Sequence, residues 1–351
     1  MNNLNLIYFS AFVSSFILTI CLVPIVRWLA LKCKIIDKPA ADRKIHSQPT
    51  PLLGGLAIFC SSFFVLAIFR FFHLANFSRV PDHFLWGIFW AACLIMLGGF
   101  WDDKYNLRPW QQIIWPLMAV LVVLFSGIKI TFITNPVYTP TNAIIYLSPL
   151  LGAGLAFFWL LGMMYTTKFL DGLDGLLSGV AAIAAMMIFL LSLDWDVANS
   201  ATGAWALIIA GSALGFLLFN WYPAKIFLGE GGSIFLGFIL GVLSIISGSK
   251  IATTLLVMGI PALDVFWVIV HRWLRGESPF SHADRKHLHF RLLTLGFSSR
   301  GAVLFLYLVS LIFGWLAIFS KGFGKLFGLG LVILLMSFLS LLIYFKNKQH
   351  A

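Results

Sequence analysis

The sequence predicts an all-α, polytopic membrane protein that crosses the bilayer ten or eleven times. Of its 351 residues, 60% are hydrophobic and 11% are charged, and the mean hydropathy is +0.96. A soluble domain of this size needs a larger polar share to cover its surface. Apolar stretches long enough to span a membrane recur from end to end, and the short alternating segments typical of a β-barrel are absent. We therefore expect a single integral membrane domain over residues 1–351.

The expected spans follow one another along the whole chain. They cover residues 6–30, 52–72, 84–101, 111–127, 149–167, 175–193, 203–219, 233–248, 251–270, 301–320 and 326–345. With the N-terminus outside, eighteen of the 24 Lys and Arg residues fall on the cytoplasmic side, as the positive-inside rule requires. Basic residues follow the first apolar run rather than precede it, which argues against a cleaved signal peptide. We expect a cytoplasmic C-terminus and a location in the inner (plasma) membrane.

Charge and cysteine content exclude other classes of protein. The net charge of +11 comes from basic residues in alternate loops, a pattern typical of membrane topology and not of nucleic-acid binding. The four cysteines form no CxxC pair and carry no redox or metal signal. Nine of the 13 acidic residues lie in cytoplasmic loops. These loops, at about 31–51, 102–110, 168–175, 220–232 and 271–300, predict a site that opens to the cytoplasm.

The central segment of the chain is Lys168–Leu176, between two apolar runs. Asp171 and Asp174 share one face if the segment is helical, and the neighbouring glycines let a ligand approach the backbone. Ionisable residues beside a span are functional candidates. The alternative is an ordinary polar turn, in which Asp and Gly are common.

Two further loops carry carboxylates at span ends. Asp102 and Asp103 are adjacent and repel each other unless a cation or base lies between them, which makes them candidates for Mg²⁺ or for proton transfer. The alternative is a solvated helix terminus. Gly229–Ser233 precedes an apolar helix and suits anion binding by free N–H groups. Glu230 there would also favour the helix dipole without any further role.

The first and last loops are basic. Arg43, Lys44 and His46 precede a Gly pair and either hold phosphates or form a plain positive-inside loop. Arg285, His287 and His289 belong to a stretch with three His and three basic residues. Zinc is a poor fit because no Cys accompanies them, so pyrophosphate binding is the better interpretation.

Together these loops resemble the polyprenyl-phosphate N-acetylhexosamine-1-phosphate transferase family (glycosyltransferase family 4) over nearly the whole chain. The motifs, in chain order, are Asp37-x-Pro with Arg43-Lys44-x-His46, Asp102-Asp103, Asp171-Gly-x-Asp174-Gly, Asn220 before Gly229-Glu230-x-Gly-Ser233, and Asp284-Arg285-x-His287-x-His289. The last motif resembles the N-acetylhexosamine branch more than the muramyl-pentapeptide branch. The order of five motifs on one face carries the resemblance, since each alone is weak.

The resemblance implies a reaction and its participants. A sugar-1-phosphate, with N-acetylglucosamine as the expected sugar, would pass from a UDP-sugar to membrane-bound undecaprenyl phosphate, releasing UMP. This step starts a cell-envelope glycan such as the O-antigen of lipopolysaccharide. Mg²⁺ or Mn²⁺ would be the cofactor, and the sequence leaves open whether the chain forms a homodimer.

The resemblance also assigns roles. Asp102 and Asp103 would deprotonate or position the lipid phosphate, and Asp171 and Asp174 would organise the nucleotide and metal side. The other assignments are Glu230 and Asp171 as metal ligands, Asn220 in the nucleotide pocket, and Lys44, His46, Lys168, Arg285, His287 and His289 as substrate-binding residues.

The chain departs from the family pattern at Lys168, where Asn is usual, and at Glu230, where Asp is usual. One hypothesis is that Lys168 and Glu230 form an ion pair that weakens or replaces the metal contact. The other is that the longer Glu still reaches the metal while Lys168 contacts phosphate.

Three other interpretations compete with the transferase. A transporter or lipid flippase would place charge near the bilayer midplane and often shows internal repeats, but only Asp264 lies deep in a span, where a helix-packing role is expected. A CDP-alcohol phosphotransferase would continue its Asp-Gly motif with Ala-Arg. A non-catalytic relative stays open because of Lys168.

Overall fold

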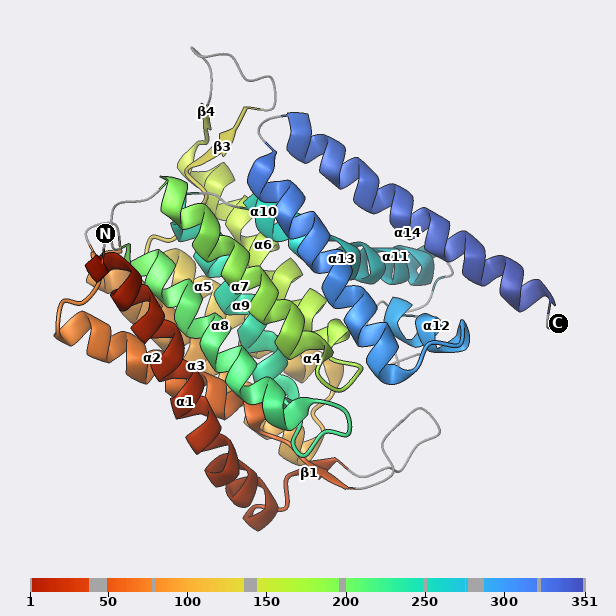
Figure 1. Cartoon of the computed structure of the whole chain (residues 1–351), viewed down its shortest axis with the longest axis horizontal. Helices are drawn as coiled ribbons and strands as arrows, with labels where there is room; N and C mark the ends of the chain where they lie inside the picture. Colours follow the sequence, from red (N-terminus) through yellow and green to blue (C-terminus); the bar gives the residue numbers. More distant parts are fainter. Residues whose placement is uncertain are drawn as a thin grey trace.

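The computed structural model describes residues 2–37, 49–77, 80–135, 144–195, 200–248, 251–274, 276, 287–320 and 323–349. As predicted, it is predominantly helical, and most of its helices run side by side (Figure 1). The helices are α1 (Asn2–Lys32), α2 (Gly54–Phe71), α3 (Asp82–Tyr105), α4 (Pro109–Gln112), α5 (Ile114–Phe125), α6 (Pro149–Leu170), α7 (Leu176–Trp195), α8 (Ala201–Asn220), α9 (Gly229–Ile246), α10 (Ile251–Val257), α11 (Gly259–Leu274), α12 (Leu288–Thr294), α13 (Ser299–Phe319) and α14 (Phe323–Gln349).

Two small antiparallel strand pairs, which the sequence analysis did not predict, lie at opposite ends of the helix bundle (Figure 1). β1 (Ile36–Asp37) pairs with β2 (Thr50–Pro51), so that Ile36 lies opposite Pro51. β3 (Phe132–Thr134) pairs with β4 (Ile144–Tyr146), so that Ile133 lies opposite Ile145. Each pair lies in a connection between two helices, and both residues of β2 are buried.

Helix α9 is at the centre of the bundle. It contacts α2, α3, α6, α7, α8 and α10, and 89% of its residues are buried. A helix that is apolar on all sides is expected in such a position, and Phe235 and Leu240, on opposite sides of α9, are both fully buried. The first turn of α9 carries Glu230, so the packing of this helix fixes the position of that carboxylate.

Glycines bring the start of α9 unusually close to its neighbours. A Cβ at Gly99 of α3 would collide with the backbone of Gly231, and one at Gly55 of α2 would collide with the backbone of Gly232. The N–H of Gly55 donates to the carbonyl of Leu228 at 2.8 Å. Small residues that allow such backbone contact are a common basis of helix packing in membranes.

The eleven expected spans all contain helix, but they differ in length and apolar character. Eight helices are long and apolar enough to cross a membrane, and a ninth span results if α10 and α11 are counted together. The expected spans 111–127 and 326–345 fall on shorter apolar helices, Pro109–Phe125 and Phe323–Leu339. The count of eleven and the orientation of the termini therefore stay predictions.

The expected span over 251–270 consists of two helices and is not straight. α10 and α11 are bent by 80° where they meet. Pro261 lies three residues into the second helix, where it lacks an N–H group and its ring would clash with the carbonyl of Val257 in a continuous helix. The bend turns α11 across the bundle (Figure 1).

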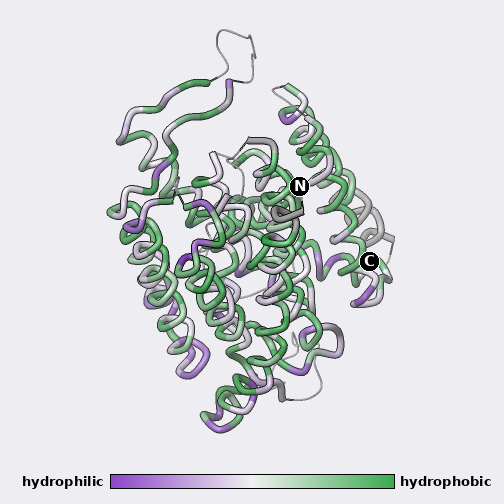
Figure 2. The backbone as a smooth tube through the Cα atoms, turned by 60° about the vertical axis from the view of Figure 1, so that its left-hand side comes forward, coloured by the Kyte–Doolittle hydropathy of each residue, from purple (hydrophilic) through white to green (hydrophobic). Residues whose placement is uncertain are grey.

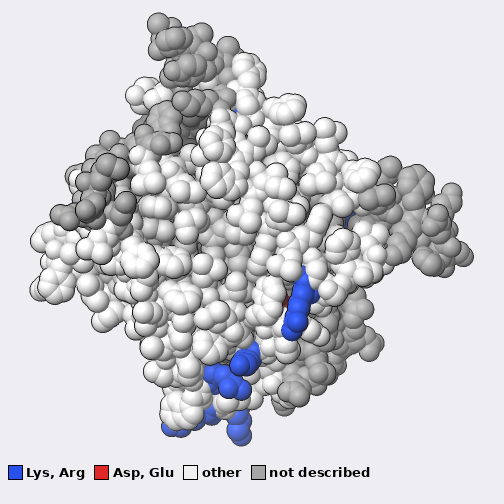
Figure 3. All heavy atoms as spheres, viewed as in Figure 1, with Lys and Arg blue, Asp and Glu red and all other residues white. Residues whose placement is uncertain are grey.

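The surface has the polarity of a membrane protein. Figure 2 shows hydrophobic residues along the helices and hydrophilic residues mainly at the turns. Large apolar side chains such as Phe125, Leu150 and Phe158 are strongly exposed. Most of the Lys and Arg side chains visible in Figure 3 lie toward the end of the molecule where α1 leads into β1.

Substitution of Gly99 by Ala is expected to destabilise the protein by about 1–3 kcal/mol, because the added methyl group overpacks the contact with α9. Gly162→Ala is the matched control, since a Cβ at Gly162 would meet nothing within 4 Å. Thermal unfolding of the purified proteins in one detergent measures the stability of both variants. Equal effects of the two substitutions would contradict this packing.

Candidate active site

The candidate site is formed by helix ends that meet at one end of the bundle. α3 and α6 end there, α8 ends at Asn220, and α9 begins at Gly229 (Figure 1). Each end carries one of the acidic or amide residues that the sequence analysis singled out. Direct hydrogen bonds join these ends to one another, so the residues form one cluster.

Asp103 holds the start of α9 to the end of α3. Its carboxylate accepts the backbone N–H of Glu230 at 3.0 and 3.2 Å. Gly229 has a φ of +76°, which favours glycine, and a Cβ there would collide with the Asp103 carboxylate. A carboxylate at a helix N-terminus is also favoured by the helix dipole. Asp103 therefore positions Glu230.

A chain of polar contacts runs from Glu230 to Asp102. The Lys168 ammonium forms an ion pair with Glu230 and donates to Oε1 of Gln112 at 2.9 Å. Nε2 of Gln112 donates to Oδ1 of Asp102 at 3.0 Å, which also accepts the N–H of Leu107 at 2.9 Å. The Lys168 and Glu230 side chains are 18% and 16% exposed. The ion pair that the first of the two hypotheses requires is thus present, and its effect on a metal contact stays a prediction.

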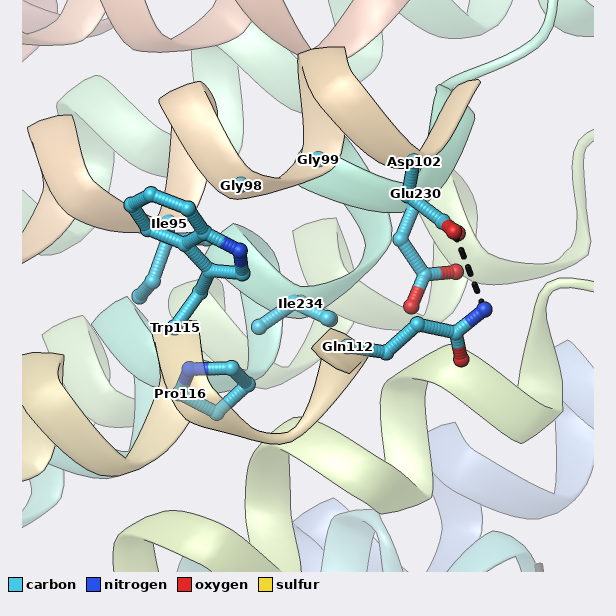
Figure 4. A pocket seen from close by; sticks show the side chains of 9 residues that line it. All are labelled: Ile95, Gly98, Gly99, Asp102, Gln112, Trp115, Pro116, Glu230 and Ile234. Carbon is cyan, nitrogen blue, oxygen red and sulfur yellow. Dashed lines mark hydrogen bonds between the residues drawn. The ribbon is translucent and has the colours of Figure 1, made fainter. Parts of the chain in front are cut away.

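An apolar pocket opens beside this chain of contacts. Ile95, Trp115, Pro116 and Ile234 line one part of it, and Asp102, Gln112 and Glu230 face one another at its other end (Figure 4). Gly98 lies directly against Trp115. The pocket thus places a hydrocarbon-like wall next to a group of polar side chains.

Asn220 ties the turn after α6 to the segment before α9. Its Oδ1 accepts the N–H of Gly175 at 3.0 Å and the hydroxyl of Ser178 at 3.2 Å, and its Nδ2 donates to the carbonyl of Ile226 at 3.0 Å. Asp174 adds a second tie, since its carboxylate accepts the N–H of Ala224 at 2.9 Å. These bonds fix the conformation of the Asp171–Gly175 turn.

Asp171 ends α6 and lies within this turn. Burial, together with the nearby charges of Glu230 and Asp174, raises the pKa of its carboxyl group to about 7. A carboxyl group with a pKa near neutrality is suited to accept a proton at physiological pH.

His287 and His289 lie next to the Asp171–Gly175 turn, at the start of α12. Nδ1 of His287 is 2.8 Å from Oδ2 of Asp264, whose Oδ1 accepts the N–H of Leu288 at 2.9 Å. The rings of His287 and His289 are parallel, with centroids 5.8 Å apart. Asp264 thereby fixes the position of the two histidines and links α11 to α12.

His289 is buried against Gly172. Its Nε2 would collide with a Cβ at that position, which explains the glycine. Burial lowers the pKa of His289 to about 3, and the charge of His287 acts in the same direction. The imidazole is therefore neutral at physiological pH and can offer a hydrogen bond but no positive charge.

Several known proteins have sequences similar to this one. Residues 85–248 match the profile of glycosyl transferase family 4. A probable undecaprenyl-phosphate N-acetylglucosaminyl 1-phosphate transferase of Bacillus subtilis (strain 168) is 30% identical over 338 residues, which cover 95% of this chain and 90% of the relative. The chain belongs to glycosyl transferase family 4.

Two further relatives carry related names. A decaprenyl-phosphate N-acetylglucosaminephosphotransferase of Mycolicibacterium smegmatis is 31% identical over 324 residues, 85% of this chain and 76% of the relative. An undecaprenyl-phosphate alpha-N-acetylglucosaminyl 1-phosphate transferase of Salmonella typhi is 25% identical over 316 residues, 86% and 81% of the two chains. The resemblance inferred from the loop motifs is thus confirmed.

The structure brings most of the predicted site residues of this family member together, but it describes only some of the basic ones. Asp102, Asp103, Lys168, Asp171 and Glu230 form one cluster, and Asp174 and Asn220 hold the adjoining turn. Lys44, His46 and Arg285 lie outside the described residues.

Sequence analysis missed two participants, Gln112 and the link made by Asp264. Gln112 carries no local signal, because its role depends on contact with distant helices. Asp264 had a signal, as a lone carboxylate in an apolar run.

The described residues contain no complete set of ligands around Glu230 and Asp171, the metal ligands that the family resemblance implies. They contain no group of three His, Cys, Asp or Glu side chains arranged to hold a metal ion. The Asp103 carboxylate is engaged by a backbone N–H, and Glu230 is engaged by the Lys168 ammonium. The requirement for Mg²⁺ or Mn²⁺ stays a prediction.

Asp171→Asn is expected to stabilise the protein at pH 8 by about 2–4 kcal/mol. Because the native-state pKa of Asp171 lies above the unfolded value, ionising this group costs stability as the pH rises from about 4 through 7, and Asn avoids that cost. The gain should shrink toward pH 4. Thermal unfolding at several pH values tests this, with exposed Asp82→Asn as the control. A gain of equal size at every pH would contradict it.

Proposed function

We propose that this protein transfers N-acetylglucosamine-1-phosphate from UDP-N-acetylglucosamine to undecaprenyl phosphate in the membrane. The names of its family relatives support the reaction class and the sugar. The observation that carries the proposal is the acidic cluster beside the apolar pocket (Figure 4). The apolar wall of this site would contact only the part of the lipid chain next to the phosphate, while the phosphate itself would lie at the polar end. The product would be the lipid-linked sugar with which a cell-envelope glycan begins.

The chemistry is a phosphoryl transfer between two anions. An oxygen of the lipid phosphate attacks the phosphorus atom that bears the sugar, and the bond from that phosphorus to the oxygen shared with UMP breaks, so UMP leaves. Catalysis of such a step consists mainly of positioning and charge stabilisation. The protein must therefore align both phosphates and offset their negative charge.

Each residue of the cluster would have its own role in aligning the phosphates and offsetting their charge. Asp102, held by Gln112 and the N–H of Leu107, lies at the pocket and would orient the lipid phosphate. Asp171, whose pKa lies near 7, would accept a proton from a lipid phosphate that arrives singly protonated. Asp103 would keep Glu230 and α9 in place. Asn220 and Asp174 would maintain the turn that faces the nucleotide.

The orientation of the site follows from the charge distribution. The cluster lies at the end of the bundle where α1 ends, which is also where the visible Lys and Arg side chains gather (Figure 3). By the positive-inside rule this end would face the cytoplasm. We infer a multi-pass protein of the inner membrane whose site is reached by UDP-sugars from the cytoplasmic side.

Release of UMP from a panel of UDP-N-acetylhexosamines tests the function. Purified protein is expected to release UMP from UDP-N-acetylglucosamine only when undecaprenyl phosphate is present. Asp102→Asn should lower the rate at least about 100-fold, as expected when a group that aligns or activates the nucleophile is lost. Asp82→Asn, on an exposed carboxylate paired with Arg70, should leave the rate unchanged.

Absence of lipid-dependent release with every sugar, from folded protein, would contradict the proposed function. Release with another UDP-N-acetylhexosamine alone would correct the sugar and retain the reaction.

A further inference from the structure

The Lys168 side chain ends inside the acidic cluster, where the carboxylates concentrate negative charge. Its ammonium contacts the carboxylate of Glu230 and lies 2.9 Å from Oε1 of Gln112. It also lies 5.9 Å from the centre of the Tyr165 ring, which adds a cation–π contact. Lys168 belongs to the last turn of α6 and Glu230 to the first turn of α9, two helices that pack against each other. The ammonium is thus held by rigid elements.

A divalent ion at this place would need free carboxylate oxygens. Mg²⁺ binds oxygen ligands at about 2.1 Å in near-octahedral geometry. Within the described part of the chain, both oxygens of Asp103 accept the N–H of Glu230, and Oδ1 of Asp102 accepts the N–H of Leu107 and Nε2 of Gln112. The remaining carboxyl group next to Glu230 is that of Asp171, so Glu230 and Asp171 would have to supply most of the protein ligands. An ion ligated by Glu230 would also lie next to the Lys168 ammonium, and the two cations would repel each other.

We propose that the Lys168 ammonium is the resident cation of this cluster and takes the place of a divalent ion at Glu230. Of the three N–H donors of an ammonium group, two are directed to Glu230 and Gln112. The third is available to a phosphate oxygen of the substrate. Lys168 then does for the reaction what a bridging metal ion does elsewhere, because it joins a protein carboxylate to a phosphate and offsets the charge of both.

Titration of Mn²⁺ into the full chain in detergent micelles, followed by electron paramagnetic resonance, tests this proposal. Mn²⁺ alone is the probe, and no substrate is added, so the result does not depend on whether the proposed transfer reaction is correct. We expect the wild-type protein and the Glu230→Gln variant to bind Mn²⁺ equally, because Glu230 does not ligate Mn²⁺ in the wild type.

Lys168→Asn should create such a site. Removing a positive charge at contact distance is expected to tighten Mn²⁺ binding at least about 100-fold, even at an effective dielectric constant of about 20. The new site should disappear in the double variant Lys168→Asn/Glu230→Gln. Lys168→Arg keeps the charge and should behave as the wild type.

Lys104→Asn is the matched control for a lost positive charge. Lys104 lies beside Asp103 in sequence but is exposed and stacks over Phe100 and Tyr105. Its removal should leave Mn²⁺ binding unchanged.

A wild-type Mn²⁺ site that Glu230→Gln abolishes would overturn the proposal. Because that measurement needs only the wild type and Glu230→Gln, it tests the proposal even if Lys168→Asn does not fold. Equal Mn²⁺ affinity of Lys168→Asn and Lys104→Asn would overturn it as well.

Discussion

Several carboxylates held together at the edge of a membrane need positive charge close by, and the Lys168–Glu230 ion pair supplies it within the fold. Removal of one partner from a buried pair leaves an uncompensated charge, which costs far more than loss of a surface pair. The pair also joins α6 to α9, and through Gln112 it reaches Asp102 on α3. The same contacts that stabilise the helix ends therefore define the electrostatics of the site.

Helix packing sets the distances on which this electrostatic arrangement depends. Glycines in α2, α3 and α9 allow backbone contact, so that the N–H of Glu230 reaches the carboxylate of Asp103. Around this fixed point, Asn220 holds the turn that contains Asp171. Side chains locked by packing and by neighbouring hydrogen bonds give a reaction site the precision that phosphoryl transfer requires.

Sequence patterns predicted the helical segments and the acidic cluster, because apolar runs mark the helices and a charged residue at the end of a run is informative on its own. The Lys168–Glu230 pair is one of two hypotheses that follow from the departure of both residues from the family pattern. The bend before α11 has a local signal in Pro261, whereas the role of Gln112 and the contact between Asp264 and His287 depend on tertiary contacts. Periodicity and composition carry no information about such contacts.

A double-mutant cycle on Lys168 and Glu230 tests the central claim most directly. The unfolding free energies of Lys168→Met, Glu230→Gln and the double variant would be compared with that of the wild type. We expect Lys168→Met to cost about 3–5 kcal/mol, because it leaves Glu230 unpaired. The double variant should cost less than the sum of the single ones by about 1–3 kcal/mol. Strictly additive effects would show that the two side chains do not interact and would contradict this account.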